Sequence, residues 1–113
     1  MELEKICVKG IENTFAISSV KKEFKKAVEK KLIQDLAVLE QEKERAIDLP
    51  QFEKLTGVDR LYSIRHPESK KNVRIIYIIE EGAVILLTAF LEKNTGDYQR
   101  AIKTALQRIK WLD

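Results

Sequence analysis

The chain has 113 residues, a length typical of one folded domain, so residues 1–113 are predicted to form a single domain. Hydrophobic residues make up 44% of it and charged residues 35%, a balance that excludes an intrinsically disordered chain. The formal net charge is only +3, so a surface that binds polyanions requires an uneven placement of the charges.

Cysteine content and hydropathy indicate the cellular compartment of the protein. A single cysteine, Cys7, excludes an internal disulfide and favours either a reducing environment or indifference to redox conditions. We interpret Cys7 as a small apolar residue rather than a catalytic thiol. No apolar run approaches the roughly 18 residues that span a bilayer, and the early charges Glu2, Glu4 and Lys5 argue against a secretory signal. The sequence therefore predicts a cytoplasmic protein with no membrane partner.

Two short strands are compatible with the beginning of the chain. Glu4–Val8 and Thr14–Ser18 each fit a strand, with turn-forming residues between them. The preferred strand lies near Phe15–Ile17, because Ser18 or Ser19 can then cap the following helix.

A long helix is predicted from Val20 to Arg45. This stretch contains no Gly, Pro or Asn, and its apolar residues recur at three- and four-residue steps with Lys and Glu between them. The same pattern fits a helical hairpin whose turn carries no signal, so both forms stay open. Its lysine pairs fit either a solvated face or a surface that steers RNA. Asp48–Pro50 ends the helical region, because proline disfavours helix at the residue before it.

Three consecutive strands are predicted in the second half of the chain. After a connector at Gln51–Gly57 they are Leu61–His66, Val73–Glu80 and Ala83–Phe90, with a tight turn at Glu80–Gly82. Strands joined by such short links form an antiparallel meander, which a helix can cover on one face.

A terminal helix completes the predicted fold. Apolar residues over Tyr98–Leu112 have helical spacing, and Asn94 or Asp97 is a plausible cap. The predicted fold class is α+β: an N-terminal long helix or helical hairpin packed on a small twisted antiparallel sheet of three or four strands, with a C-terminal helix.

Several common active sites are excluded by motif. One Cys and one His cannot form the usual zinc site, and the sequence predicts neither a metal nor another cofactor. The glycine-rich phosphate motifs GxxxxGK[ST] and GxGxxG are missing, as is a GxSxG nucleophile elbow.

The remaining candidate site is a pair of arginines on neighbouring strands. From Lys54 to Tyr77 the chain carries six cations and two acidic residues, which fits either a solvated face or a polyanion partner. Strand alternation lets Arg65 and Arg74 converge on the face that the helix leaves uncovered. Two such guanidinium groups repel each other unless an anion lies between them, which suggests a phosphate. Two arginines at a solvated sheet edge are the alternative.

Four motifs together resemble the bacterial RelE/ParE toxin superfamily. In chain order they are Leu55–Gly57, Leu61–Arg65, Val73–Tyr77 and Leu87–Asn94. Asp97-Tyr98 then opens an alanine-spaced terminal helix, and the resemblance covers about residues 49–109. Two positions depart from the family pattern: Val73 replaces an aromatic residue before the arginine, and Glu92 replaces the first lysine of a pair typical of the HigB-like branch.

The resemblance implies the toxin of a type II toxin–antitoxin module: a ribosome-dependent, metal-free mRNA endoribonuclease that inhibits translation. Such cleavage proceeds by attack of a ribose 2′-hydroxyl on the adjacent phosphate, which requires cations around the transition state and proton transfer at two oxygens. The implied partners are a cognate antitoxin and mRNA on the ribosome.

The resemblance also implies roles for individual residues. Arg65 and Arg74 match the cations that clamp the scissile phosphate. Lys93 falls near another cationic position, and Tyr98 matches a tyrosine that stacks on a base or transfers a proton. Further RNA contacts are expected from the neighbouring basic side chains, namely Lys54, Arg60, His66, Lys70 and Lys71.

Other interpretations stay open at this point. His66 is either an acid/base group or a half-buried turn residue before proline. A ParE-like, non-enzymatic inhibitor of DNA gyrase would share the fold, and so would a degenerate family member without toxicity.

Overall fold

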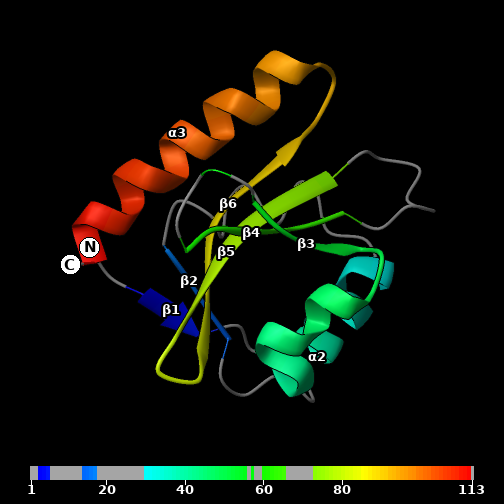
Figure 1. Ribbon diagram of the computed structural model, residues 1–113. Coiled ribbons are helices and arrows are strands. Elements are labelled where there is room, and N and C mark those ends of the chain that lie inside the picture. Colours follow the sequence, from blue (N-terminus) through cyan, green and yellow to red (C-terminus); the bar gives the residue numbers. More distant parts are fainter. Residues whose placement is uncertain are drawn as a thin grey trace.

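The computed structural model describes residues 3–5, 14–17, 30–55, 57, 60–65 and 73–112, and Figure 1 shows its strands and helices. In chain order they are β1 (Leu3–Lys5), β2 (Thr14–Ile17), α2 (Lys30–Glu42), the 3₁₀ helix η1 (Lys43–Asp48), β3 (Phe52–Lys54), β4 (Tyr62–Ile64), β5 (Val73–Glu80), β6 (Ala83–Leu91) and α3 (Thr95–Leu112). The α+β class is as predicted.

The strands form one six-stranded mixed sheet in the order β1-β2-β6-β5-β4-β3. β2 and β6 are parallel, and the other neighbours are antiparallel. The predicted antiparallel sheet of three or four strands was therefore too small. The meander β4-β5-β6 is its centre, and β2 joins it by pairing with a strand far away in the sequence, which local patterns do not reveal. β3 was taken for part of a connector because only three residues are in the ladder.

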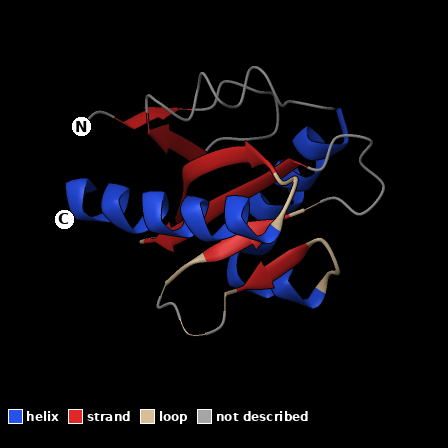
Figure 2. Cartoon of the chain, turned by 90° about the horizontal axis from the view of Figure 1, so that it is seen from above, coloured by secondary structure: helices blue, strands red, loops and turns tan. Residues whose placement is uncertain are grey.

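The sheet lies between the two helices (Figures 1 and 2). Side chains alternate along β5, so Tyr77 faces one side and Arg74 the other. On the Tyr77 side, Thr14 of β2 donates a hydrogen bond of 2.7 Å to Glu40 of α2. On the Arg74 side, Phe90 of β6 packs against Tyr98 of α3.

Apolar side chains are buried on both faces of the sheet, and Ile76 and Ile78 lie on the Arg74 side. Leu36 and Leu39 of α2 are fully buried together with Ile64, Ile75 and Tyr77 of the sheet. Each large apolar side chain buried in this way contributes roughly 1.5–3 kcal/mol to folding. These buried residues fix the strand positions from which Arg74 and Ser63 present their polar groups.

The predicted helix from Val20 to Arg45 ends earlier in the structure. It is not the first element, because β1 and β2 precede it, and residues 20–29 lie outside the described residues. α2 ends at Glu42, and Lys43, the first residue of η1, has a φ of 53°. A left-handed backbone at lysine costs about 1 kcal/mol. No Gly or Asn marks the break, so the sequence did not reveal it.

The hairpin between β5 and β6 is as predicted. Its turn has positive φ at Glu81 (51°) and Gly82 (80°), the conformation that matches the twist of paired strands. Farther along, Ile76 pairs with Thr88 but Tyr77 pairs with Leu86, so Leu87 is an extra residue in β6. Arg108 of α3 donates a 2.6 Å hydrogen bond to the Leu87 carbonyl and so fastens the helix to the bulge.

The terminal helix α3 begins at Thr95, three residues before its predicted start at Tyr98. Within the described ranges, no helix is both long and apolar enough to cross a bilayer.

Candidate functional site

Arg74, near the start of β5, is the centre of the candidate site. Its side chain is only 13% exposed. The guanidinium carbon lies 4.2 Å from the centre of the Tyr98 ring, within the range of a cation–π interaction. Because Tyr98 belongs to α3, this contact joins the sheet to the terminal helix.

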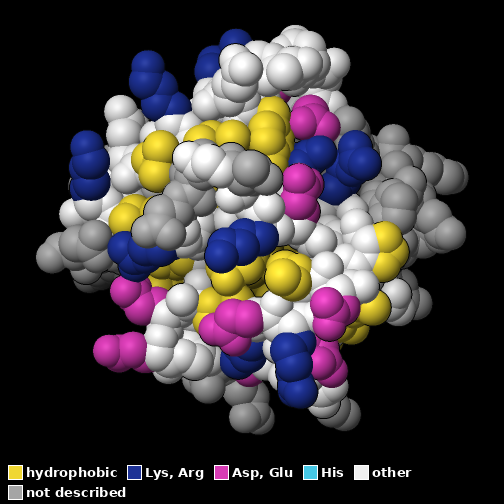
Figure 3. Space-filling view, in the orientation of Figure 1, with side chains coloured by type: hydrophobic (Ala, Val, Ile, Leu, Met, Phe, Trp, Pro, Cys, Tyr) yellow, Lys and Arg dark blue, Asp and Glu magenta, His cyan; other side chains and the backbone are white. Residues whose placement is uncertain are grey.

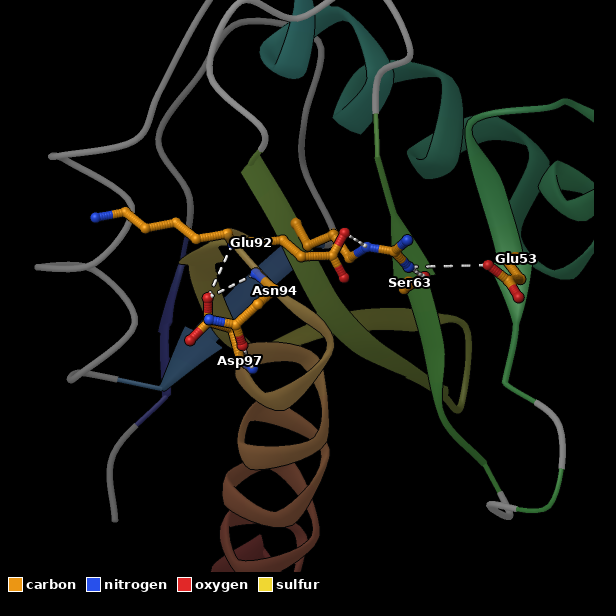
Figure 4. Close-up of polar contacts among 7 residues, drawn as sticks. Glu53, Ser63, Glu92, Asn94 and Asp97 are labelled. Atoms are coloured by element: carbon orange, nitrogen blue, oxygen red, sulfur yellow. Dashed lines mark hydrogen bonds and ion pairs between the residues drawn. The ribbon is translucent and has the colours of Figure 1, made fainter.

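Polar groups from three other segments surround the guanidinium of Arg74 (Figure 4). Its Nε lies 3.3 Å from Oε1 of Glu92, just after β6, and its Nη1 lies 3.9 Å from Oε2 of Glu53 in β3. Nη1 also donates a long hydrogen bond of 3.4 Å to Oγ of Ser63 in β4. Two of these neighbours are acidic, so the charge of Arg74 is offset within the chain.

The contact with Glu92 is one of charge rather than of a directed hydrogen bond. Nε of Arg74 is buried and forms no aligned hydrogen bond within the described part of the chain, although the Glu92 oxygen is only 3.3 Å away. At that separation the Coulomb attraction remains, whereas a hydrogen bond also requires the N–H to point at its acceptor.

The first turn of α3 positions Tyr98. The Asp97 N–H donates to Oδ1 of Asn94, and the Asp97 carboxylate accepts from the backbone N–H groups of Lys93 and Asn94. This reciprocal cap uses both residues that the sequence offered as candidates. The N–H of Lys93 has the largest effect and lowers the pKa of Asp97 below its usual value. Desolvation, the second effect, raises it, and the Asn94 N–H and the Arg100 side chain lower it further.

A pocket of about 270 Å³ opens beside Tyr98. It is lined by Glu92, Lys93, Asn94, Thr95 and Tyr98. An aromatic ring beside charged and amide side chains is a suitable surface for a nucleobase, which combines a flat face with a polar edge.

Arg65 lies at the same end of the sheet as Arg74. Ile64 pairs with Ile75, so Arg65 comes next, at the position opposite Arg74. Its N–H donates to the Gln51 carbonyl at 2.9 Å, and its side chain is exposed. The structure thus brings the two predicted arginines together, with one guanidinium paired and the other at the surface.

The other predicted residues are distributed more widely. Lys93 is exposed at the pocket next to Tyr98. Lys54 pairs in register with Tyr62, which places it on the face opposite Arg74. Arg60 has a φ of 71° and forms a 2.8 Å ion pair with Glu80 at the far end of β5. The predicted RNA contacts His66, Lys70 and Lys71 lie outside the described residues.

Three neighbours of Arg74 were not predicted as site residues: Glu53, Ser63 and Glu92. Glu92 was noted only as a departure from a family pattern. Ser63 shares the alternation of Arg65, and Glu53 pairs with Ser63 in the ladder. Recognition of β3 as a strand would have placed Glu53 on this face.

Charges of both signs lie on one face of the molecule. On the side seen in Figure 3, basic and acidic side chains are interspersed. In the described part of the chain, no cluster of three or more His, Cys, Asp or Glu residues could hold a metal ion. The arrangement combines a planar cation on an aromatic ring, two exposed cations and two carboxylates, which suits an anionic, aromatic ligand.

Comparisons with known proteins agree with the fold. The sequence model of the family "Phage derived protein Gp49-like (DUF891)" matches residues 21–110. The isolated E. coli RelE toxin has a similar structure, with a TM-score of 0.58 and 19% sequence identity over 80% of this chain and 94% of that chain. An arginine-to-alanine double mutant of E. coli RelE in the free state gives a TM-score of 0.55 and 20% identity over 80% and 93%. A search of curated proteins found no significant match. The predicted RelE-like fold is confirmed.

Proposed function

This chain belongs to the Phage derived protein Gp49-like family and has a RelE-like fold, and we propose that it is the toxin of a toxin–antitoxin pair that cleaves mRNA on the ribosome. The observation that carries the proposal is the Arg74 guanidinium stacked on Tyr98, with Arg65 and Lys93 exposed nearby. The proposed partners are mRNA on the ribosome and a cognate antitoxin that binds the toxin and covers this end of the sheet.

Cleavage of a phosphodiester by the proposed reaction requires both stabilisation of negative charge and proton transfer. The ribose 2′-oxygen attacks the adjacent phosphorus, its proton leaves to a base, and the 5′-oxygen of the next nucleotide departs with a proton. Negative charge builds on the two non-bridging oxygens of the phosphate. A guanidinium can donate to both oxygens at once, which is the role proposed for Arg74 and Arg65.

Tyr98 has two candidate tasks in this reaction. Its ring already holds Arg74 and borders the pocket, so a nucleobase can stack beside it. Its hydroxyl is also a candidate proton donor to the leaving 5′-oxygen. His66, the other acid/base candidate, remains a prediction from the sequence.

The experiment is induction in a bacterial host, with growth followed and transcripts mapped by primer extension. Wild type is expected to arrest growth and to produce mRNA cuts in phase with codons. Arg65→Ala changes an exposed side chain and should leave folding intact while it removes a phosphate contact. Arg74→Lys keeps the charge but loses the planar fork, so cleavage should fall by about 10²-fold.

Two further variants complete that experiment. Tyr98→Phe retains the ring, so a loss of about 10²-fold assigns proton transfer to the hydroxyl and near-normal activity assigns stacking. Arg45→Ala, at an arginine that is 79% exposed on η1, is the matched control and should behave as wild type. Growth arrest with intact transcripts would contradict the nuclease.

The pairing of Arg74 with two carboxylates favours a second candidate, a RelE-like protein without nuclease activity. A non-enzymatic inhibitor of DNA gyrase would arrest growth with intact mRNA and trapped gyrase–DNA complexes. A non-toxic family member would cause no arrest.

A further inference from the structure

We propose that Glu92 is an internal counter-charge for Arg74, which an RNA phosphate must outcompete, so that the carboxylate sets the RNA affinity of this site. The inference rests on the proposed function, because it assumes that Arg74 receives a phosphate. In it Glu92 is a positioning residue, which acts on the substrate through Arg74.

The burial of the pair makes Glu92 the stronger of the two acidic neighbours. The side chains of Arg74 and Glu92 are 13% and 17% exposed, whereas that of Glu53 is 61% exposed. Water screens an exposed carboxylate strongly and a buried one much less. Glu92 therefore accounts for most of the neutralisation of Arg74.

The geometry of the contact indicates that Glu92 neutralises the charge of Arg74 rather than orienting its guanidinium. A carboxylate that orients a guanidinium does so through aligned N–H···O bonds. Glu92 lies 3.3 Å from Nε without such alignment, whereas stacking on Tyr98 and the bond to Ser63 fix the plane of the guanidinium. Loss of the negative charge should therefore leave Arg74 in place.

The same contact places a negative charge where a phosphate would be repelled. A phosphate that bridges Arg74 and Arg65 would lie within a few ångströms of the Glu92 carboxylate. Like charges at that separation oppose binding unless one moves away. We infer that wild-type affinity for RNA is held below what its arginines alone would give.

The test is binding of a short single-stranded oligonucleotide, measured by fluorescence anisotropy at several salt concentrations. A DNA oligonucleotide lacks the attacking 2′-hydroxyl, so it reports binding without cleavage, and an RNA of the same sequence is compared with it. Glu92→Gln keeps the size of the side chain and removes its charge. It should bind about tenfold more tightly than wild type. The slope of log K against log salt should steepen by about 0.7, as expected for one more neutralised phosphate on a single strand.

Two variants control for general electrostatics and for folding. Glu42 forms an ion pair with Arg45 on the other side of the sheet. Glu42→Gln removes that carboxylate and should change neither the affinity for the oligonucleotide nor the salt slope. Glu53→Gln should tighten binding in the same direction but by about twofold, because that carboxylate is exposed. Thermal unfolding of each variant shows whether a change in binding follows from a change in folding.

The outcomes separate this inference from the proposed function. If wild type binds and Arg74→Lys weakens binding, but Glu92→Gln binds no more tightly than wild type, the counter-charge is refuted and the phosphate site stands. If neither wild type nor Glu92→Gln binds either oligonucleotide, the phosphate site and the counter-charge fail together.

Discussion

The two ends of β5 carry the same kind of ion pair in different surroundings. At one end Arg74 pairs with Glu92, and their side chains are 13% and 17% exposed. At the other end Arg60 pairs with Glu80 at 2.8 Å, and their side chains are 39% and 42% exposed. The shorter contact is the more exposed one, so distance and burial rank the two pairs in opposite order. Burial should decide their energies, because solvent screens the exposed pair.

The largest expected effect is the coupling energy within each pair. A double-mutant cycle with Arg74→Ala and Glu92→Ala should give a coupling of about 2 kcal/mol, because each charge is left buried without its partner. The matched cycle with Arg60→Ala and Glu80→Ala should give less than about 1 kcal/mol. Urea unfolding of the four single and two double variants measures both. A larger coupling for Arg60 and Glu80 would show that distance, not burial, controls the pairs, and equal couplings would contradict the dominance of burial.

An intermediate effect is expected at Tyr77, between the two ends of β5. Its ring is buried and stacks on Tyr62 at 5.3 Å, but its hydroxyl has no hydrogen-bond partner among the described residues. Tyr77→Phe removes the desolvation of that hydroxyl, and should raise the free energy of unfolding by up to about 1 kcal/mol. Chemical denaturation of wild type and variant at neutral pH tests this.

The same hydroxyl predicts a pH dependence. Burial, and secondly Tyr62, raises the pKa of Tyr77 above its ordinary value. Above pH about 10 the unfolded chain loses this proton while the folded chain retains it. Stability should therefore fall as pH rises above 10, by up to about 1.4 kcal/mol per pH unit from this group, and the fall should be smaller in Tyr77→Phe. Identical alkaline profiles would place the cause elsewhere.

The smallest effect is expected at the hairpin turn beside Glu80. Glu81 has a φ of 51°, which asparagine adopts at lower cost, and Gly82 follows it. Glu81→Asn should stabilise the protein by about 0.5 kcal/mol and leave binding of the DNA oligonucleotide unchanged, because the turn is at the opposite end of β5 from Arg74. A thermal melt and an anisotropy titration check both parts.

Much of the fold could be predicted from local patterns. The bounds of β5, its turn into β6 and the cap of α3 follow from a run of β-branched and aromatic residues, an acidic-glycine turn and an Asn/Asp pair. The parallel partner of β2 could not be predicted, because a single sequence does not encode distant strand order in any local signal. The break at Lys43 was missed for another reason, since tertiary structure imposes a left-handed conformation that lysine does not favour.

The candidate site, too, could be predicted only in part from the sequence. Alternation and the family pattern selected Arg65, Arg74, Lys93 and Tyr98, and the structure brings these four to one end of the sheet. Its acidic half was not predicted. Glu92 lies just beyond a strand and Glu53 in a strand of three residues, where alternation is too short to assign a face. Sequence reasoning detected the cations and missed their counter-charges.

The parallel pairing of β2 with β6 has a consequence for the order of synthesis. β2 leaves the ribosome early, but its partners Val84, Ile85 and Leu86 are made about 70 residues later, which takes seconds at roughly 5–20 residues per second. Arg74, Glu92 and Tyr98 come from the same late part of the chain. A nascent chain therefore assembles neither its full sheet nor the Arg74 cluster until most of it has been translated, and the ribosome that makes it meets no finished site before then.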